Sequence, residues 1–262
     1  MGDLAGDGVG PVHGVLVHDV RVTGLELQLG QRLEELPGLD LVLVLMSGRP
    51  LILEFEAANV PAILEAWHGG TEAGNAVADV LYGKYNPSGK LTMTFPVNVG
   101  QIPIYYNHKN TGRPYVGNRS DKYKSRYLDI ENAPLFPFGY GLSYTTFSYS
   151  DLKLDKQKLA ANGVLTVSVK LTNTGKYDGT EVAQLYVRDM VGSIGRPVKE
   201  LKGFQKVFLK TGESRTLTFT LTPADLAFYN TDLQLKAEPG DFKVFVGTSS
   251  ASGLESSFEL LK

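Results

Sequence analysis

Four carboxylates in the first third of the chain, Glu54, Glu56, Glu72 and Asp79, are placed where acid–base chemistry could occur. Two Asp or Glu side chains about 5–9.5 Å apart can hydrolyse a glycosidic bond, because one protonates the leaving oxygen while the other acts as nucleophile or base. Glu72 also fits as a first-turn helix carboxylate, and Asp79 as a solvated helix-face residue. Surface charges more often have such structural roles, and both alternatives stay open.

Trp67 and His68 stand where an apolar run meets Gly69-Gly70, at the expected end of a strand. A tryptophan ring could pack on the apolar face of a sugar while an imidazole donates a hydrogen bond to it. Alternatively, Trp67 packs between the sheet and the following connector. Trp67, His68 and Glu72 are therefore the candidate substrate-binding residues.

The sequence lacks the residues and motifs that other classes of enzyme need for catalysis. The chain has no cysteine, no G-x-S-x-G motif around Ser47, and no phosphate-binding glycine motif. The histidines never occur as H-x-x-x-H, and the acids show no calcium-loop spacing; these histidines are His13, His18, His68 and His108. We expect no metal site and no cofactor.

Strand and helix patterns alternate between residues 39 and 96. A continuous apolar run at 41–46 predicts a strand buried on both faces, and residues 51–53 continue extended. After the apolar run at 62–67, Thr71 is expected to cap a helix that ends at Gly83. The turn at 86–89 precedes an alternating segment, 90–95, that predicts another strand.

The remaining sequence divides into an aromatic-rich connector and an all-β region. Residues 97–144 lack periodicity but contain many Tyr and Phe residues, which indicates an ordered connector rather than a flexible linker. About seven short alternating segments with regular turns follow, typical of an immunoglobulin-like β-sandwich. The predicted fold is thus α+β, with a partial α/β-sandwich layer followed by a β-sandwich.

Composition excludes several functional classes. The 262 residues carry 26 basic and 28 acidic side chains, and no basic cluster indicates nucleic-acid binding. No apolar stretch reaches the ~18 residues of a membrane span. The first fourteen residues do not form a signal peptide. We therefore expect no nucleic acid and no membrane as partner, and a homodimer remains open.

Several strings resemble glycoside hydrolase family 3 in the periplasmic β-glucosidase branch. They are WHGGTEAGNA (67–76), ADVLYG (78–83), NPSGKL (86–91), TFP (94–96), GQIPIYYNH (100–108), FPFGYGLSYT (136–145), NTG (173–175), QLYV (184–187) and RPVKELKGF (196–204). The resemblance runs from about Leu39 to Leu261. It implies the second, α/β-sandwich domain of the family followed by its fibronectin type III-like domain.

The resemblance predicts four segments with different roles. They are an atypical, weakly ordered segment at 1–38, a partial α/β-sandwich domain at 39–96, the connector at 97–144, and a fibronectin type III-like sandwich at 145–262. The implied activity is retaining exo-hydrolysis of terminal β-glucosyl or β-xylosyl residues, acting on β-linked oligosaccharides or aryl glucosides in the periplasm or outside the cell.

No catalytic residue is carried over from the resemblance. The family places its nucleophilic aspartate on an N-terminal barrel, which the resemblance does not include, and its acid/base glutamate in a loop before Leu39. There the pattern is lost, and Glu26, Glu34 and Glu35 lack the expected neighbours. We therefore expect residues 1–38 to be foreign to the fold and the chain alone to be inactive. The alternative function is a non-catalytic carbohydrate-binding or assembly module.

Overall fold

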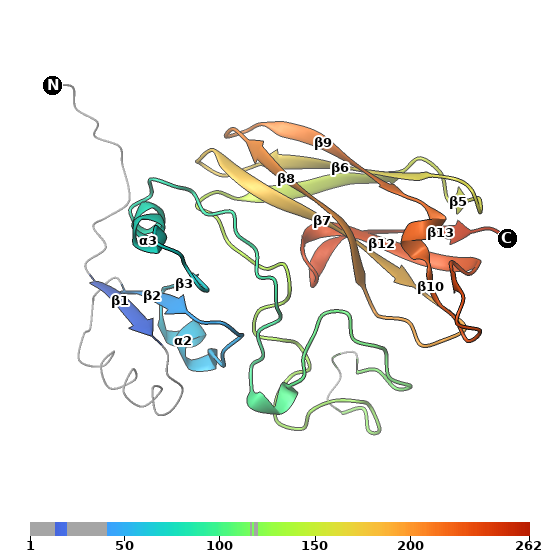
Figure 1. Ribbon diagram of the computed structural model, residues 1–262, viewed down its shortest axis with the longest axis horizontal. Helices are drawn as coiled ribbons and strands as arrows, with labels where there is room; N and C mark the ends of the chain where they lie inside the picture. Colours follow the sequence, from blue (N-terminus) through green and yellow to red (C-terminus); the bar gives the residue numbers. More distant parts are fainter. Residues whose placement is uncertain (1–13, 20–40, 116, 118–119) are drawn as a thin grey trace. The chain divides into compact units, whose positions relative to one another are not determined.

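The computed structural model describes residues 14–19, 41–115, 117 and 120–262, the first six through their backbone alone. The chain divides into two compact units, Met1–Tyr85 and Asn86–Lys262 (Figure 1). Our predictions for Glu26, Glu34, Glu35 and the rest of the weakly ordered segment lie outside the described residues. The four predicted domain boundaries stay predictions.

The first unit contains a parallel sheet of three strands. Its order is β1 (Gly14–Asp19), β2 (Leu41–Met46) and β3 (Ala62–Glu65), and β2 pairs in parallel with both neighbours. Leu43, Val44 and Leu45 in the central strand are only 1–2% exposed. The continuous apolar run therefore marks a buried parallel strand, as predicted.

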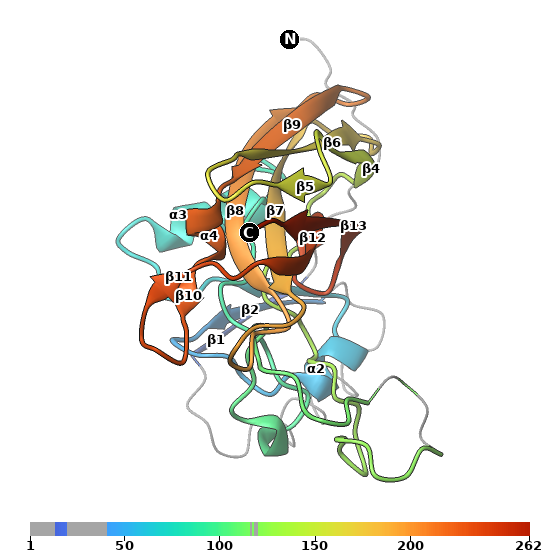
Figure 2. The same ribbon diagram turned by 90° about the vertical axis from the view of Figure 1, so that its right-hand side faces the viewer.

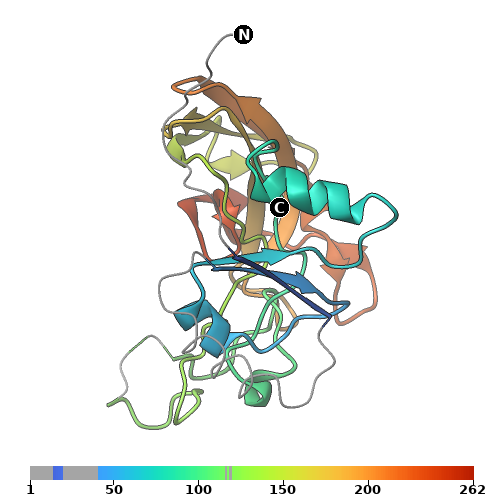
Figure 3. The same ribbon diagram turned by 90° about the vertical axis from the view of Figure 1, so that its left-hand side faces the viewer.

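Two helices lie on opposite sides of this sheet. Figures 1 and 3 show α2 (Glu54–Asn59) on one side and α3 (Ala73–Leu81) on the other. Gly83 follows α3 with φ of +72°, a left-handed conformation that glycine adopts without steric cost, so the predicted helix end is confirmed. The mixed α/β layer of the predicted fold is confirmed.

Two features of the first unit go beyond the sequence predictions, and one prediction, that of the helix cap, is wrong. Residues 14–19 pair in parallel with β2 as β1, because β2 offers an edge whose backbone groups need partners. Residues 51–53, expected to continue extended, lead directly into α2, a helix that local periodicity is too short to reveal. Glu72, not Thr71, occupies the N-cap position of α3, and it makes no side-chain cap bond.

The second unit begins with residues 86–146, a segment of irregular backbone that includes the predicted connector, and we call this whole segment the connector from here on. Its one short helix in the described residues is η1 (Val99–Gln101). The Tyr106 ring stacks on Phe138 at 4.4 Å between centroids, and Phe136 stacks on Tyr140 at 5.3 Å. Phe95, 1% exposed, meets Phe136 edge-on. Aromatic packing thus stabilises a segment that has little regular hydrogen bonding.

The strand predicted at residues 90–95 is wrong. Only Phe95 makes a β-bridge, with Phe136, and Leu91 exchanges two 2.7 Å backbone hydrogen bonds with Gly139 and Tyr140. These two points of pairing are separated by residues that do not continue the ladder. The alternating pattern is therefore satisfied by irregular pairing with residues 135–140 instead of by a sheet.

Two sheets packed face to face complete the second unit (Figure 2). One has the order β4 (Phe147–Leu154), β6 (Leu165–Asn173) and β9 (Ser214–Leu221). The other has the order β5 (Lys158–Leu159), β13 (Ser252–Leu260), β12 (Gly240–Ser249), β7 (Gly179–Asp189) and β8 (Glu200–Leu209). Between β9 and β12 lie α4 (Pro223–Leu226), β10 (Phe228–Tyr229) and β11 (Leu235–Lys236).

The core of this sandwich follows from strict alternation along its strands. In β6, Leu165, Val167, Val169 and Leu171 are fully buried while the intervening residues are not. Inward-facing residues of β7, β9 and β12 complete the same apolar cluster. Successive side chains of a strand point to opposite faces, so alternation places one set in the core. The predicted immunoglobulin-like sandwich is confirmed.

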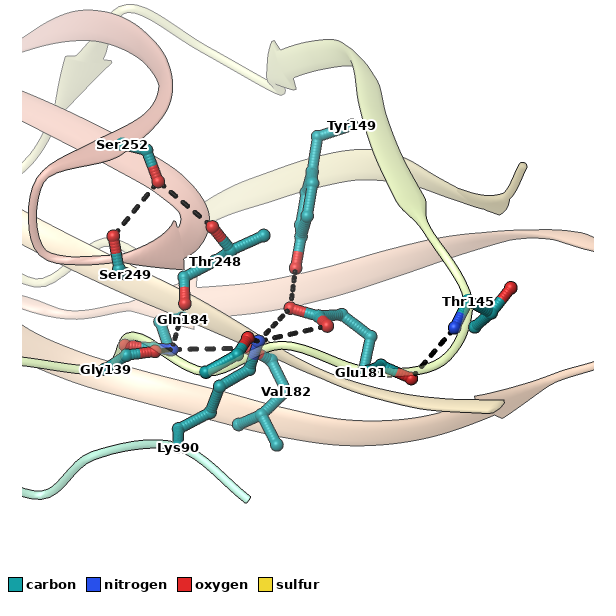
Figure 4. A network of polar contacts seen from close by, with 12 residues as sticks. Lys90, Gly139, Thr145, Tyr149, Glu181, Val182, Gln184, Thr248, Ser249 and Ser252 are labelled. Atoms are coloured by element: carbon teal, nitrogen blue, oxygen red, sulfur yellow. Dashed lines mark hydrogen bonds and ion pairs between the residues drawn. The ribbon is translucent and has the colours of Figure 1, made fainter. Parts of the chain in front are cut away.

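A buried ion pair fastens the connector to the sandwich (Figure 4). The Lys90 ammonium lies 3.2 Å from each carboxylate oxygen of Glu181 in β7 and donates to the Gly141 carbonyl at 2.9 Å. The Tyr149 hydroxyl donates to the same carboxylate at 3.2 Å. The two charged side chains are 11% and 3% exposed. Burial raises the pKa of Glu181, and Lys90 and Tyr149 offset part of this effect by stabilising the charged form.

Replacing Lys90 should therefore destabilise the second unit strongly. Lys90→Met leaves the Glu181 carboxylate buried without its cation, and we expect a loss of about 3–5 kcal/mol in the free energy of unfolding. Lys206→Met, at an exposed lysine of β8, is the control and should change it by less than about 0.5 kcal/mol. Urea unfolding measures both. The double variant Lys90→Met/Glu181→Leu should recover most of the loss, and no recovery would contradict the ion-pair explanation.

Candidate functional site

The ends of β2 and β3 bring two loops to one edge of the first unit's sheet. Leu45 lies opposite Glu65 in the parallel ladder, and the Ala66 N–H donates to the Leu45 carbonyl at 2.8 Å. The residues after each strand, 47–49 and 66–68, therefore emerge side by side. In open α/β sheets, ligands bind outside the carboxyl ends of parallel strands. We call Ser47, Glu65, Trp67 and His68 the strand-end site.

The Glu65 carboxylate joins the two loops of the strand-end site. It accepts a 2.9 Å hydrogen bond from the Trp67 backbone N–H, and the Ser47 hydroxyl lies 3.4 Å from its Oε1. Ser47 also donates to the Arg49 carbonyl at 3.0 Å. Burial raises the pKa of Glu65, and the two donors reduce this shift. Glu65 is thus a positioning residue in this site.

Trp67 and His68 lie at the end of β3, where sequence reasoning expected a turn. Trp67 has φ of +50°, a left-handed conformation that is unusual for a bulky residue. Its N–H bond to Glu65 helps to hold this backbone in place. His68 is exposed, and its Nε2 would lie 2.6 Å from a Cβ added at Gly48. Glycine at position 48 therefore lets the imidazole lie over the loop that follows β2.

The other predicted carboxylates do not gather at this edge. Glu54 and Glu56 lie on α2, whereas Asp79 lies on α3 on the opposite side of the sheet (Figure 3). Asp79 pairs with Lys84 at 3.0 Å, where both side chains are well exposed. Glu72 is exposed at the start of α3 and accepts a hydrogen bond from the Asn75 amide. These contacts fit the structural roles that stayed open for Glu72 and Asp79.

Glu65 is the residue that sequence reasoning missed. In the sequence it is one acid within the run 62–67, and no motif separates it from a surface residue. The one available signal was a carboxylate at the end of a predicted parallel strand, two residues before the tryptophan. Its partner Ser47 is 18 residues away, so only the parallel pairing reveals their contact.

Two further kinds of feature are absent from the described residues. No three His, Asp or Glu side chains in this part of the chain come together in a way that could hold a metal ion. Within the same residues, no helix has the length and apolar character needed to cross a membrane.

The chain contains an α/β layer with a strand-end site, then a connector, and then an immunoglobulin-like sandwich. This order of parts is that of the C-terminal domains of a glycoside hydrolase. The sequence model of the glycosyl hydrolase family 3 C-terminal domain matches residues 21–144, and that of the fibronectin type III-like domain matches residues 181–250. The chain therefore carries a glycosyl hydrolase family 3 C-terminal domain followed by a fibronectin type III-like domain. The first match includes residues 21–38, so the expectation that the resemblance starts near Leu39 is wrong.

Similar proteins have names that indicate β-glycosidases. A periplasmic β-glucosidase of Salmonella typhimurium is 55% identical over 86% of this chain and 29% of its own length. A β-xylosidase of Formosa agariphila is 47% identical over 88% of this chain and 31% of its own. The crystal structure of a Listeria innocua β-glucosidase in complex with glucose superposes with a TM-score of 0.85 at 46% identity, covering 90% of this chain and 32% of that one. The chain thus spans about a third of the length of these relatives.

The raised pKa of Glu65 makes a prediction about pH. A carboxyl whose pKa is raised on folding stabilises the fold most below its ordinary pKa of 4.5, and this contribution is lost as the pH rises through the folded value. The free energy of unfolding of the unchanged chain, minus that of Glu65→Gln, should therefore increase as the pH falls from neutral towards 4.5. Urea unfolding followed by Trp67 fluorescence measures this difference. Glu54→Gln, at an exposed position of α2, is the control, and equal pH profiles for the two variants would contradict a special role of Glu65.

Proposed function

We propose that this chain forms the C-terminal part of a retaining, exo-acting β-glucosidase or β-xylosidase. The observation that carries the proposal is the match of both C-terminal domains, in the same order, to relatives named as β-glucosidases and β-xylosidases. The substrate class is a β-linked oligosaccharide or an aryl glycoside with a terminal glucosyl or xylosyl residue. Two of the similar structures, both from Listeria innocua, contain glucose and laminaribiose.

In this proposal the strand-end site supplies part of the rim of the sugar site. The Trp67 ring packs against the apolar face of the sugar, and the His68 imidazole hydrogen-bonds to a sugar hydroxyl. Glu72, at the start of α3, accepts a hydrogen bond from another hydroxyl. Glu65 and Gly48 act indirectly, because they set the positions of Trp67 and His68.

The two reacting carboxyl groups come from elsewhere in this proposal. A retaining glycosidase needs a nucleophilic carboxylate and a second carboxyl that protonates the leaving oxygen. The family resemblance places the first on a barrel domain and the second in a loop before Leu39. The 262-residue chain by itself is therefore expected to contact the sugar and to support the sugar site, but not to hydrolyse a glycosidic bond. Because one similar enzyme is named periplasmic, we propose the periplasm or the cell exterior as the place of action.

A non-catalytic carbohydrate-binding or assembly module is the second candidate function. It is favoured by the distribution of carboxylates in the described residues, where Glu54 and Glu56 lie across the sheet from Asp79. Such a module would bind sugars without any hydrolytic partner. The two functions predict different results when a separate barrel domain is added to the chain. Hydrolysis of a glycoside should appear only if the chain is part of a glycosidase.

Mixing the chain with a barrel domain tests the proposed function. The purified chain alone should not hydrolyse a chromogenic β-glucoside or β-xyloside above background, because the acting carboxylates work only together. Adding a separately expressed family barrel that retains its acid/base loop should produce turnover. No gain in rate would favour the non-catalytic module. Turnover by the chain alone that is abolished by Glu72→Gln or Glu54→Gln would contradict the proposal.

The same mixture tests the role of Trp67. Trp67→Ala should lower kcat/KM by about two- to tenfold, the size expected for the loss of one aromatic contact with the sugar. Tyr229→Ala removes an aromatic ring that is 62% exposed in β10 and is the matched control. Equal kcat/KM for both variants would contradict a sugar-binding role for Trp67.

A further inference from the structure

A cavity of about 400 Å³ lies in the second unit, on the outer face of the five-stranded sheet. Its walls come from β7, β12 and β13, from the residues before β8, and from the connector. This volume lies within the roughly 300–1,000 Å³ of sites for small molecules. The residues that determine its character are Tyr105, Arg188, Lys199, Lys243, Phe245 and Glu255.

The strand register places like charges side by side in this cavity. Val187 and Val244 point into the sandwich core, so their neighbours Arg188 and Lys243 point outward. Arg188 in β7 lies directly opposite Lys243 in β12. Like charges in directly opposite positions destabilise a sheet. A bound anion would relieve this repulsion.

A third cation adds to the positive charge of the cavity. Lys199 donates to the Ser250 carbonyl at 2.7 Å and lies 4.2 Å from the centre of the Phe245 ring. Burial lowers the pKa of Lys199, the Glu255 carboxylate opposes this shift, and the positive charge of Arg188 adds to it. The carbonyl and the ring hold the Lys199 ammonium in place, and neither of them carries a neutralising charge.

A single carboxylate in the described lining opposes these three cations. Glu255 lies 3.2 Å from Lys243 and forms an ion pair with it. The Arg188 guanidinium makes no side-chain hydrogen bond or ion pair with the described residues. Its planar guanidinium matches a carboxylate or phosphate through two parallel hydrogen bonds. The cavity thus has an excess of positive charge, and the guanidinium N–H donors of Arg188 are available to a ligand.

Aromatic rings line the same cavity beside the cations. Tyr105 is 51% exposed, and Phe245 lies opposite Glu255 in the β12–β13 ladder. The neighbouring Tyr106 is anchored by its stack on Phe138, which fixes the backbone that carries Tyr105. Aromatic faces bind the apolar faces of ring-shaped ligands. A ligand of this cavity therefore needs both a ring and an anionic group.

We propose that this cavity is a binding site for an anionic sugar, a pyranose that carries a carboxylate or a phosphate. The anionic group pairs with Arg188 and Lys199, and the sugar ring packs against Tyr105. The site lies within the second unit and uses none of the residues of the strand-end site. It does not depend on the proposed glycosidase function.

Calorimetric titration of the full 262-residue chain tests this site. Glucuronic acid and glucose 6-phosphate represent the carboxylate and phosphate forms, glucose is the neutral sugar, and inorganic phosphate is the anion without a ring. We expect one or both anionic sugars to bind with millimolar or tighter affinity. Glucose and inorganic phosphate should bind at least about tenfold more weakly, because glucose lacks the anionic group and inorganic phosphate lacks the sugar ring. The tighter of the two anionic sugars identifies the anionic group.

Two variants separate the charge contact from the ring contact. Arg188→Gln should weaken binding of the anionic sugar at least about tenfold, as expected for a hydrogen bond to a charged group. Its melting temperature without ligand should stay the same or rise, because the repulsion from Lys243 is removed. Tyr105→Ala should weaken binding of the anionic sugar but leave that of inorganic phosphate unchanged. Lys170→Gln, which removes an exposed charge from β6 in the other sheet, is the control and should bind like the unchanged chain.

Several outcomes would contradict the proposal of an anionic-sugar site. These are equal binding of glucose and glucuronic acid, equal binding of inorganic phosphate and glucose 6-phosphate, or no binding of either anionic sugar. Equal affinities for Arg188→Gln and Lys170→Gln would do the same. None of these measurements requires hydrolysis, so failure of this site and failure of the proposed function are distinguishable.

Discussion

The second unit depends on a strand face that is buried by irregular chain instead of by another sheet. Gln184 and Tyr186 in β7 point away from the sandwich core, yet they are only 3% and 0% exposed. The Gln184 amide donates to the carbonyls of Gly139 and Thr248 at 3.1 and 2.7 Å (Figure 4). The Gln184 side-chain oxygen accepts a hydrogen bond from the Tyr186 hydroxyl. A Cβ at Gly139, where φ is +80°, would lie 2.0 Å from that oxygen. The connector can approach β7 this closely only because residue 139 is glycine.

The same face changes character further along β7. Tyr106 covers Tyr186 edge-on and accepts a hydrogen bond from the Leu201 N–H through its hydroxyl, which fixes the connector at this point. The next outward residue of the strand is Arg188, which lines the cavity beside Tyr105. A single strand therefore provides a buried polar anchor at Gln184 and a charged cavity wall at Arg188. The placement of the cavity follows from where the connector is anchored.

The parts of the fold that could be predicted are those in which local pattern and burial agree. The alternation of β6 and the apolar run of β2 appear directly in the sequence, because each strand buries a face that its own residues define. The connector could not be predicted in this way. Its anchor joins Lys90 to Glu181, 91 residues later, and its segment 90–95 alternates like a strand without forming one. In the strand-end site, Trp67 and His68 follow from the end of a strand, whereas the contact of Glu65 with Ser47 arises only from the parallel pairing of β2 and β3.

The geometry of Glu65 indicates that this carboxylate positions a neighbouring side chain and that other groups carry out the chemistry. A bulky residue in the left-handed region is strained, and such strain persists where the surroundings hold it and where the site uses it. Here the Glu65 carboxylate holds Trp67 through its N–H. The Oε1 atom accepts this bond, and loss of the carboxylate charge would weaken the bond that sets the position of the ring. The carboxylate nearest to Trp67 in the chain is therefore committed to structure. A sugar placed at this edge would need its acid and its nucleophile from residues outside the strand-end site.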